Sequence, residues 1–254
     1  MVTEKTIGSV LEAGSDTTSA ALYSFVLAMV LYPEVQQKAH EELDRKFLDS
    51  LPGYEDIASL PYIRSVMKET LRWLGPTPLG AVPHAVIQDD VYMVRRLNLA
   101  FDTQINKSQG YKIPKGASIM NNVWTISNDP HRYTDPRRFE PDRYRHDSNS
   151  IADTVTHVDP ALRDHFTFGA GRRMCPGIHV AERSLFIALS RLLWAFDFLP
   201  VKGKEPDQTK LRQGIVMMPE PFEADFRLRE GKGDLVKSIW KEAQAVLEEK
   251  GQWK

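Results

Sequence analysis

The spacing of apolar residues along the chain predicts a largely helical protein. In residues 3–32, apolar side chains recur at intervals of three and four, which is the period of a helix with one buried face. The same period appears in residues 34–47, 59–73 and 178–198, and in a charged segment at 234–250. We therefore expect a mainly α chain whose core forms between the apolar faces of these helices.

Short alternating segments predict small β-hairpins beside the helices. Residues 75–83 are rich in proline and glycine and predict a loop, and a strand is predicted at 85–92. We expect this strand to return in a hairpin closed by Pro-Lys-Gly at 114–116, but residues 94–109 interrupt it. A further hairpin is predicted within residues 214–229.

Residues 94–109, with the sequence VRRLNLAFDTQINKSQ, are predicted to be an insertion that breaks the first hairpin. One explanation is translation of a retained intron, because valine codons begin with GT and the final glutamine can be encoded by CAG. The other is a surface-loop insertion, which is tolerated because loop-closure entropy grows slowly with length. The genomic sequence distinguishes the two explanations.

The composition excludes several classes of protein. The chain has 254 residues, of which 42% are hydrophobic and 26% charged, and its net charge is −1. This is typical of a soluble globular chain, and the absence of a basic stripe predicts no nucleic-acid partner. With one cysteine and dispersed histidines, neither an internal disulfide nor a structural zinc site is expected. Residues 1–6 lack signal-peptide features, and the longest apolar run, 19–32, is too short to span a bilayer.

The single cysteine, Cys175, lies in a segment with its own chemistry. Gly169 and Gly171 precede it and allow a sharply turning loop, and Pro176 is predicted as the first residue of the following helix. Unpaired N–H groups and the helix dipole favour a thiolate at such a position. The alternative is a small buried hydrophobe, which is the usual environment of a free cysteine.

This segment resembles the haem-binding loop of the cytochrome P-450 family, the haem-thiolate monooxygenases, whose pattern is F-x-x-G-x-R-x-C-x-G. The fixed positions are filled by Phe168, Gly171, Arg173, Cys175 and Gly177. The resemblance implies haem b (iron protoporphyrin IX) as the cofactor and Cys175 as the axial ligand of its iron. Arg173 adds positive charge that suits the carboxylates of the ligand.

A second motif, A-G-S-D-T-T, lies in the first predicted helix and has two interpretations. In the first, Ser15 or Asp16 is an N-cap and the helix begins there. In the second, a long helix runs through a local distortion, as in the A-G-x-D-T-T motif of the same family. The resemblance then implies that Ala13 and Gly14 leave room for dioxygen. It also implies that Asp16 and Thr17 relay protons to it.

A third motif, E-T-L-R, places Glu69 and Arg72 on one helix face. An isolated exposed pair would contribute only about 0 to 1 kcal/mol. The pair resembles the family's E-x-x-R motif, which implies a buried structural network completed downstream by Arg143. The resemblance also implies that His84 binds a haem propionate, although a lone histidine is more often an ordinary surface or core residue.

The resemblance covers residues 1–254 as a single partial domain. It implies an incomplete fold, mainly α with small β-hairpins, that runs from the family's central long helix to the helix after the haem-binding loop. The N-terminal membrane anchor and the first half of the family's fold are expected to be missing. Intact members lie at the cytoplasmic face of the endoplasmic reticulum, whereas this chain without an anchor is expected in the cytoplasm.

The implied function is insertion of one oxygen atom from O2 into an apolar small molecule, with electrons from an NADPH-dependent cytochrome reductase. The pattern is most similar to filamentous fungal members that act in secondary metabolism. The alternative is a truncated, catalytically inactive remnant or an incomplete gene model. A cysteine hydrolase built on Cys175 and His179 has little support, because no third orienting group accompanies them.

Overall fold

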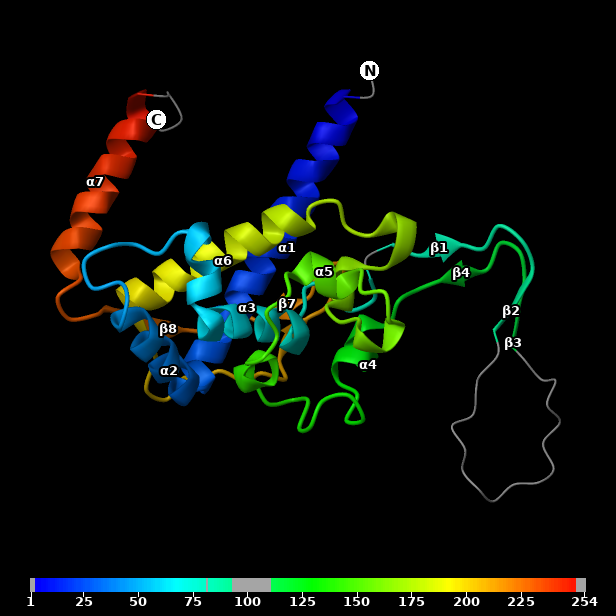
Figure 1. Ribbon diagram of the computed structural model, residues 1–254, viewed down its shortest axis with the longest axis horizontal. Helices are drawn as coiled ribbons and strands as arrows, with labels where there is room; N and C mark the ends of the chain where they lie inside the picture. Colours follow the sequence, from blue (N-terminus) through cyan, green and yellow to red (C-terminus); the bar gives the residue numbers. More distant parts are fainter. Residues whose placement is uncertain (1–2, 81, 93–110, 250–254) are drawn as a thin grey trace.

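A computed structural model describes residues 3–80, 82–92 and 111–249, so residues 94–109 lie outside the described part (Figure 1). The described chain is mainly helical. Its α-helices are α1 (Thr3–Leu31), α2 (Pro33–Asp44), α3 (Pro61–Trp73), α4 (Val123–Ser127), α5 (Ile151–Val155), α6 (Ile178–Ala195) and α7 (Gly233–Glu249). The 3-10 helices are η1 (Tyr54–Ser59), η2 (Pro141–Tyr144), η3 (Pro160–Leu162), η4 (Phe166–Phe168) and η5 (Gly171–Arg173).

Strands are short and pair two by two. They are β1 (His84–Ala85), β2 (Asp90–Tyr92), β3 (Tyr111–Ile113), β4 (Ser118–Ile119), β5 (Phe196–Pro200), β6 (Leu211–Arg212), β7 (Met218–Pro219) and β8 (Ala224–Leu228). The pairs are β1–β4, β2–β3, β5–β8 and β6–β7, all antiparallel. The expectation of a mainly α fold with small β-hairpins is therefore confirmed.

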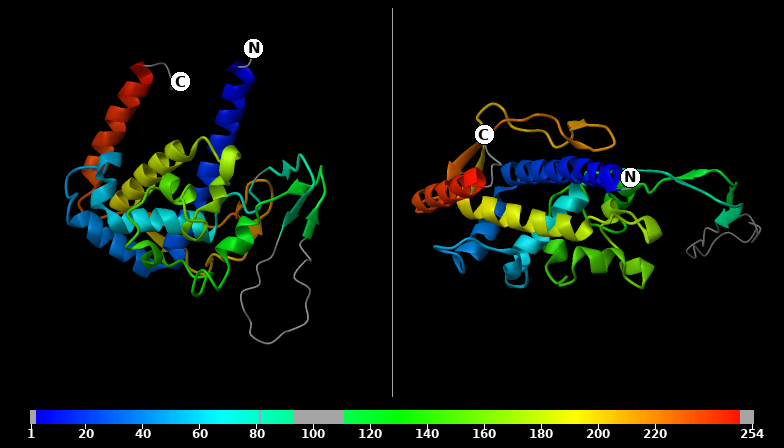
Figure 2. Two further views of the ribbon diagram at one scale, coloured as in Figure 1. Left: turned by 45° about the vertical axis from the view of Figure 1, so that its right-hand side comes forward. Right: turned by 90° about the horizontal axis from the view of Figure 1, so that it is seen from above.

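The core lies between α1, α2, α3 and α6. Helices α1 and α6 lie side by side, as the view from above shows (Figure 2). Their facing sides and those of α2 and α3 are apolar and buried, with Phe25, Ala28, Met29, Leu43, Ile63, Met67, Phe186, Leu189 and Leu193 among the fully buried residues. Burial of such side chains is the main favourable contribution to folding.

Helix α1 continues through the A-G-S-D-T-T segment without a break. The hydroxyl of Thr17 donates a hydrogen bond to the Ala13 carbonyl at 2.7 Å, and the hydroxyl of Ser15 donates to the Glu12 carbonyl at 3.2 Å. These side chains bond back to the helix instead of capping its start. The interpretation with an N-cap at Ser15 or Asp16 is therefore wrong.

Helices α3 and α6 begin with different N-terminal residues. Helix α3 begins with Pro61, and the Glu42 carboxylate from α2 accepts the N–H groups of Tyr62 and Ile63 at 2.9 and 3.0 Å. Helix α6 begins at Ile178 with Gly177 as its N-cap, so the prediction of Pro176 as the first helical residue is wrong. Pro176 lies in the turn before the helix.

The strands on either side of residues 94–109 pair with each other, which corrects two predictions. Tyr92 of β2 faces Tyr111 of β3, so the insertion does not break the hairpin. Residues 114–117 form a turn, with Ala117 N–H donating to the Pro114 carbonyl at 3.0 Å, but this turn lies between β3 and β4. It bends the returning strand and does not close the hairpin.

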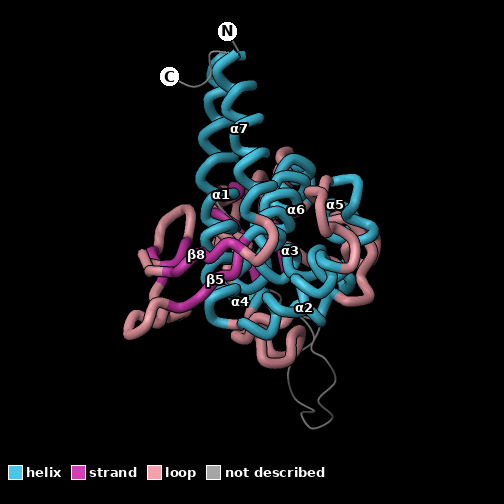
Figure 3. The backbone as a smooth tube through the Cα atoms, turned by 90° about the vertical axis from the view of Figure 1, so that its left-hand side faces the viewer, coloured by secondary structure: helices cyan, strands magenta, loops and turns pink. Residues whose placement is uncertain are grey.

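The predicted hairpin over residues 214–229 is also divided differently. Strand β7 pairs with β6, whereas β8 pairs with β5, which follows α6 directly (Figure 3). Pro219 ends β7 and Pro221 lies between β7 and β8, and proline has no N–H to continue a ladder. Phe198 of β5 packs edge-on against Phe25 of α1 at 5.7 Å, so this sheet adds to the core.

Helix α7 and the N-terminal part of α1 project from the body in the same direction (Figure 1). Helix α7 has no fully buried residue, in agreement with the prediction of a charged, solvated helix. Within the described ranges no single helix is long and apolar enough to cross a membrane. The bent pair formed by residues 11–31 and α2 passes that test only in combination, with an angle of 103° between its parts.

Candidate functional site

Backbone hydrogen bonds within residues 165–175 hold the loop that precedes α6. The Cys175 N–H donates to the Phe168 carbonyl at 2.8 Å, and the Phe168 N–H donates to the His165 carbonyl at 3.1 Å. Gly169 and Gly171 have φ angles of +78° and +67°, in the left-handed region that glycine adopts without strain. The glycine spacing thus allows the loop to turn back on itself and to present Cys175.

The Cys175 thiol lies next to the start of α6. It is free and half-buried, and a Cβ atom built at Gly177, the N-cap, would lie 3.7 Å from its sulfur. The sulfur is therefore close to the N-terminal end of α6. A Cβ atom at position 177 would be in ordinary van der Waals contact with the sulfur.

A cavity of about 960 Å³ opens in front of this cysteine. Its walls come from α1, from residues within 76–80 and 82–87, from residues 119–121, and from the cysteine loop with the first turns of α6. Ala13 and Thr17 of α1 line it together with Cys175. Segments that lie far apart in the sequence thus converge on one space beside the only thiol.

The lining of this cavity is apolar with a basic part. Arg172 and Arg173 contribute exposed guanidinium groups, and His84 from β1 contributes an imidazole. Among the described lining residues there is no carboxylate. Such a surface suits a ligand that is mostly apolar and carries negative charge at one edge.

The residues predicted from sequence divide into two groups around this cavity. Its lining includes Ala13, Thr17, His84, Phe168, Arg173 and Cys175. Four others are not part of the lining: Gly14, Asp16, Gly171 and Gly177. Asp16 is exposed on α1 next to Thr17, and the hydroxyl of Ser15 lies 3.5 Å from its carboxylate.

Glu69, Arg72 and Arg143 lie together. The Glu69 carboxylate accepts two hydrogen bonds from Arg72, both at 2.7 Å, one from the Glu140 N–H at 2.8 Å and one from Arg143 Nε at 3.4 Å. The side chains of Glu69 and Arg72 are fully buried. Burial lowers the pKa of Arg72, but the bond to Glu69 raises it more, so the pKa lies above its usual value and the guanidinium stays charged.

This network fastens the long segment between α4 and η2. Arg72 also donates to the carbonyls of Ser127 and Pro136, at 2.7 and 2.9 Å, and the Trp73 indole donates to the Arg137 carbonyl at 2.7 Å. Because that segment has few backbone hydrogen bonds of its own, side chains of α3 satisfy its carbonyls. The hydrogen bonds of this network thus go to other parts of the chain, and none of its three residues, Glu69, Arg72 and Arg143, lines the cavity.

Sequence reasoning missed a hydrogen-bonded contact between two walls of the cavity. The Thr77 hydroxyl donates to the Thr167 carbonyl at 2.8 Å and lies 2.8 Å from the Thr167 hydroxyl. The Asn121 amide donates to the Phe166 carbonyl at 3.3 Å. All these bonds link the cysteine loop to segments distant in sequence. No local pattern signals them, since threonine and asparagine are common in loops.

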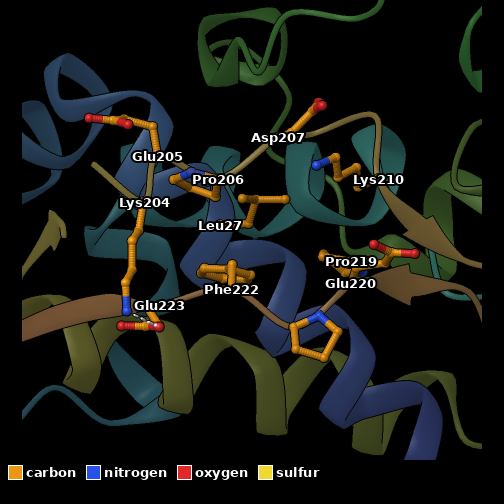
Figure 4. A pocket seen from close by; sticks show the side chains of 11 residues that line it. Leu27, Lys204, Glu205, Pro206, Asp207, Lys210, Pro219, Glu220, Phe222 and Glu223 are labelled. Carbon is orange, nitrogen blue, oxygen red and sulfur yellow. Dashed lines mark hydrogen bonds and ion pairs between the residues drawn. The ribbon is translucent and has the colours of Figure 1, made fainter. Parts of the chain in front are cut away.

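A second, smaller hollow of about 410 Å³ lies farther along α1, at Leu27 (Figure 4). Leu27 and Phe222 are among its apolar residues, and its charged residues include Lys204 and Glu223, which form an ion pair at 2.5 Å. None of the residues predicted for the site lines this hollow. The predicted site residues that line a cavity therefore line the one at Cys175.

Comparison of the sequence with known proteins identifies relatives. Residues 2–226 match the family described as cytochrome P-450. The cytochrome P-450 monooxygenase virE of Hypocrea virens is 45% identical over 254 residues, covering 97% of this chain and 43% of that protein. The monooxygenases fsoB of Humicola fuscoatra and fogE of Aspergillus ruber are 43% and 42% identical, and the chain covers 44% of each. The chain thus spans less than half the length of these curated relatives.

Solved structures give the same result for the fold. Two zebrafish cytochrome P-450 structures, one with abiraterone and one with progesterone, match the chain with TM-scores of 0.67 and 0.68 at 27% sequence identity. Each match covers 87% of this chain, and 47% and 44% of the respective solved chains. With the sequence match over most of its length and this agreement in fold, the chain belongs to the cytochrome P-450 family.

Proposed function

We propose that this chain forms the haem-thiolate half of a monooxygenase that inserts one oxygen atom from O2 into an apolar small molecule. The observation that carries the proposal is the convergence of Cys175, Thr17 and the basic residues on one cavity of about 960 Å³. Because the relatives named above are fungal monooxygenases, a fungal secondary-metabolite pathway is the proposed setting.

Haem b is the proposed cofactor, and the side chains of the cavity fit it. Cys175 would ligate the iron through its thiolate, and Arg173 and His84 would bind the propionates. The apolar lining suits the porphyrin, and Phe168 contributes to it. When bound, haem would supply the iron at which dioxygen is activated.

Residues of α1 would leave room for dioxygen and would transfer protons to it. Ala13 has a small side chain and Gly14 has none, which would leave room for a diatomic molecule, and Ala13 is part of the lining. Thr17 also lines the cavity, and its hydroxyl donates to the Ala13 carbonyl. Asp16 is exposed beside it and would take protons from water and hand them inward through Thr17.

The proposed reaction consumes one O2, two protons and two electrons. One atom of O2 is inserted into a C–H bond of the substrate, and the other leaves as water after two protons and two electrons are added. The electrons would come from an NADPH-dependent cytochrome reductase. Protons would arrive through Asp16 and Thr17, so loss of either group should slow the step that cleaves the O–O bond.

An open cavity favours a second candidate, that the 254-residue chain by itself is inactive. Val82 and Ile87 line the cavity but are 66% and 80% exposed, and Ile119 is 46% exposed. Exposed apolar walls of this kind are typical of a surface that another segment covers. In this alternative the motifs are present, but substrate is not enclosed.

The test is spectroscopic. The chain is expressed, supplied with haem, reduced and exposed to carbon monoxide. The red-shifted Soret band of a thiolate-ligated complex is expected for the wild-type chain and not for Cys175→Ser. Haem binding without that band, or an unchanged band in Cys175→Ser, would contradict the assignment of Cys175. NADPH consumption with added reductase and without product would favour the inactive alternative.

A further inference from the structure

A carboxylate that no motif marked lies directly before the cysteine loop. The partly buried Asp164 accepts hydrogen bonds from the Tyr133 hydroxyl at 2.6 Å, the Tyr144 hydroxyl at 3.0 Å and the His165 N–H at 2.7 Å. Tyr133, Tyr144 and His165 are themselves buried. Three donors from three different segments therefore meet on one carboxylate.

Two backbone hydrogen bonds connect His165, whose N–H binds this carboxylate, with the cysteine. His165 adopts a left-handed conformation, with φ +57°, which is uncommon for a residue other than glycine. Its carbonyl accepts the Phe168 N–H at 3.1 Å, and the Phe168 carbonyl accepts the Cys175 N–H at 2.8 Å. Asp164 thus fixes the residue from which the loop turns, and the loop ends on Cys175.

The same carboxylate also joins the loop to the network around Glu69. The Arg72 guanidinium lies over the Tyr133 ring at 5.0 Å, and the Tyr144 ring stacks on His165 at 5.3 Å. Tyr144 follows Arg143 directly in η2. Through its two tyrosine partners, Asp164 therefore connects the α3 network with the cysteine loop.

The charge state of Asp164 suits this role. Burial raises its pKa, but His165 and the hydrogen bonds from Tyr133, the His165 N–H and Tyr144 lower the pKa more, so it lies below its ordinary value. The group is therefore a carboxylate at neutral pH. Hydrogen bonds to an ionised acceptor are shorter and stronger than those between neutral groups.

We propose that Asp164 is a positioning residue for the haem ligand, acting through His165 and Phe168 on the backbone of Cys175. The proposal rests on the proposed function, because the position of Cys175 matters to a haem iron only if Cys175 ligates it. Asp164 is not among the residues that line the cavity. Its effect would be to limit the orientations that the loop can adopt.

Hydrogen exchange of the haem-free full chain tests the proposal without requiring activity. In Asp164→Ala, amides in residues 166–177 should exchange about thirtyfold faster, because three hydrogen bonds are lost and loss of each gives about threefold. Exchange in α2 should be unchanged. The matched control is Glu42→Ala, which removes another buried carboxylate that accepts backbone N–H groups, at the start of α3. It should leave residues 166–177 unaffected.

Equal acceleration of residues 166–177 in both variants, or none in Asp164→Ala, would overturn the proposal. If Asp164→Ala does not fold, Tyr144→Phe keeps the ring stack and removes one donor, and about threefold faster exchange is expected. Unchanged exchange in Tyr144→Phe would count equally against the proposal. Asp164→Asn keeps an acceptor oxygen and should restore most of the protection.

A haem-loaded comparison separates this proposal from the proposed function. Asp164→Ala should convert a larger share of the reduced carbon monoxide complex to the form without thiolate ligation, and Asp164→Asn should convert less. If the wild-type chain takes up no haem, the proposed function fails while the exchange result still decides the role of Asp164 in the loop. Faster exchange with an unchanged carbon monoxide spectrum would overturn the positioning of the ligand.

Discussion

Tyr92 and Tyr111 face each other in an antiparallel ladder, although residues 93–110 lie between them in the sequence. The register continues through Val91 with Lys112 and Asp90 with Ile113. If residues 94–109 were absent, Met93 and Gly110 alone would connect the paired tyrosines. Two-residue connections are the commonest in hairpins, and glycine at the second position suits a type I′ turn, so the paired strands are compatible with an insertion bounded at 94 and 109.

Deletion of residues 94–109 should therefore leave the fold intact and stabilise it. Each halving of loop length lowers the closure cost by about 0.6 kcal/mol, so a gain of about 2 kcal/mol in the free energy of unfolding is expected. Urea denaturation measures it. The matched control deletes residues 95–110 and leaves Met93-Val94, which lacks the glycine that a tight turn favours. A control at least as stable as the first deletion would contradict the proposed boundaries.

Glu69→Ala should lower the free energy of unfolding by about 3–5 kcal/mol, because it leaves the buried Arg72 guanidinium without its partner. The comparison is Glu34→Ala, which removes an ion pair with Arg138 at 3.3 Å in which both side chains are 52% exposed. That change should cost less than about 1 kcal/mol. Denaturation and haem uptake are measured for both variants. Haem uptake at the wild-type level in Glu69→Ala would show that the network does not support the site.

Gly171→Ala should destabilise the chain by about 1 kcal/mol or more through the backbone alone. The residue has φ +67°, while a Cβ atom there would meet nothing within 4 Å. Gly8 in α1 also has open space around a Cβ atom but no positive φ, so Gly8→Ala should stabilise by about 0.5–1 kcal/mol. Opposite shifts in Tm are expected. A neutral Gly171→Ala would argue against a fixed conformation of the cysteine loop.

Stability should fall on acidification through His165. Burial lowers its pKa below the ordinary value of 6.5, so below pH 6.5 the unfolded chain binds a proton that the folded chain does not. One such group contributes a slope of at most about 1.4 kcal/mol per pH unit. His165→Phe retains a ring against Tyr144 and should remove this contribution. Unfolding free energies at pH 7.5, 6.5 and 5.5 measure it, and an equal slope in both proteins would refute the assignment.

The parts of the fold that local sequence determines were predicted well. Helix positions follow from apolar spacing, and the Glu69–Arg72 pair follows from its spacing within one helix face. The turn of the cysteine loop follows from Gly169 and Gly171, because positive φ angles need residues without a side chain. For these features the determining residues are neighbours in the sequence.

Features that depend on distant partners could not be predicted in this way. The pairing of β5 with β8 and the Thr77–Thr167 contact join segments whose local sequences carry no trace of each other. Asp164 is a further example, since only the folded chain brings Tyr133 and Tyr144 to it. The boundary of α6 was misplaced by two residues because proline is tolerated both at a helix start and in the turn before it.

The packing of α1 has a consequence for synthesis on the ribosome. Phe25 of α1 packs against Phe198 of β5, and Tyr23 stacks on Phe222 at 4.7 Å. Both partners lie far downstream, so α1 leaves the exit tunnel long before the residues that cover its aromatic side chains exist. During that interval the helix exposes its apolar surface, to which chaperones that bind nascent chains can attach.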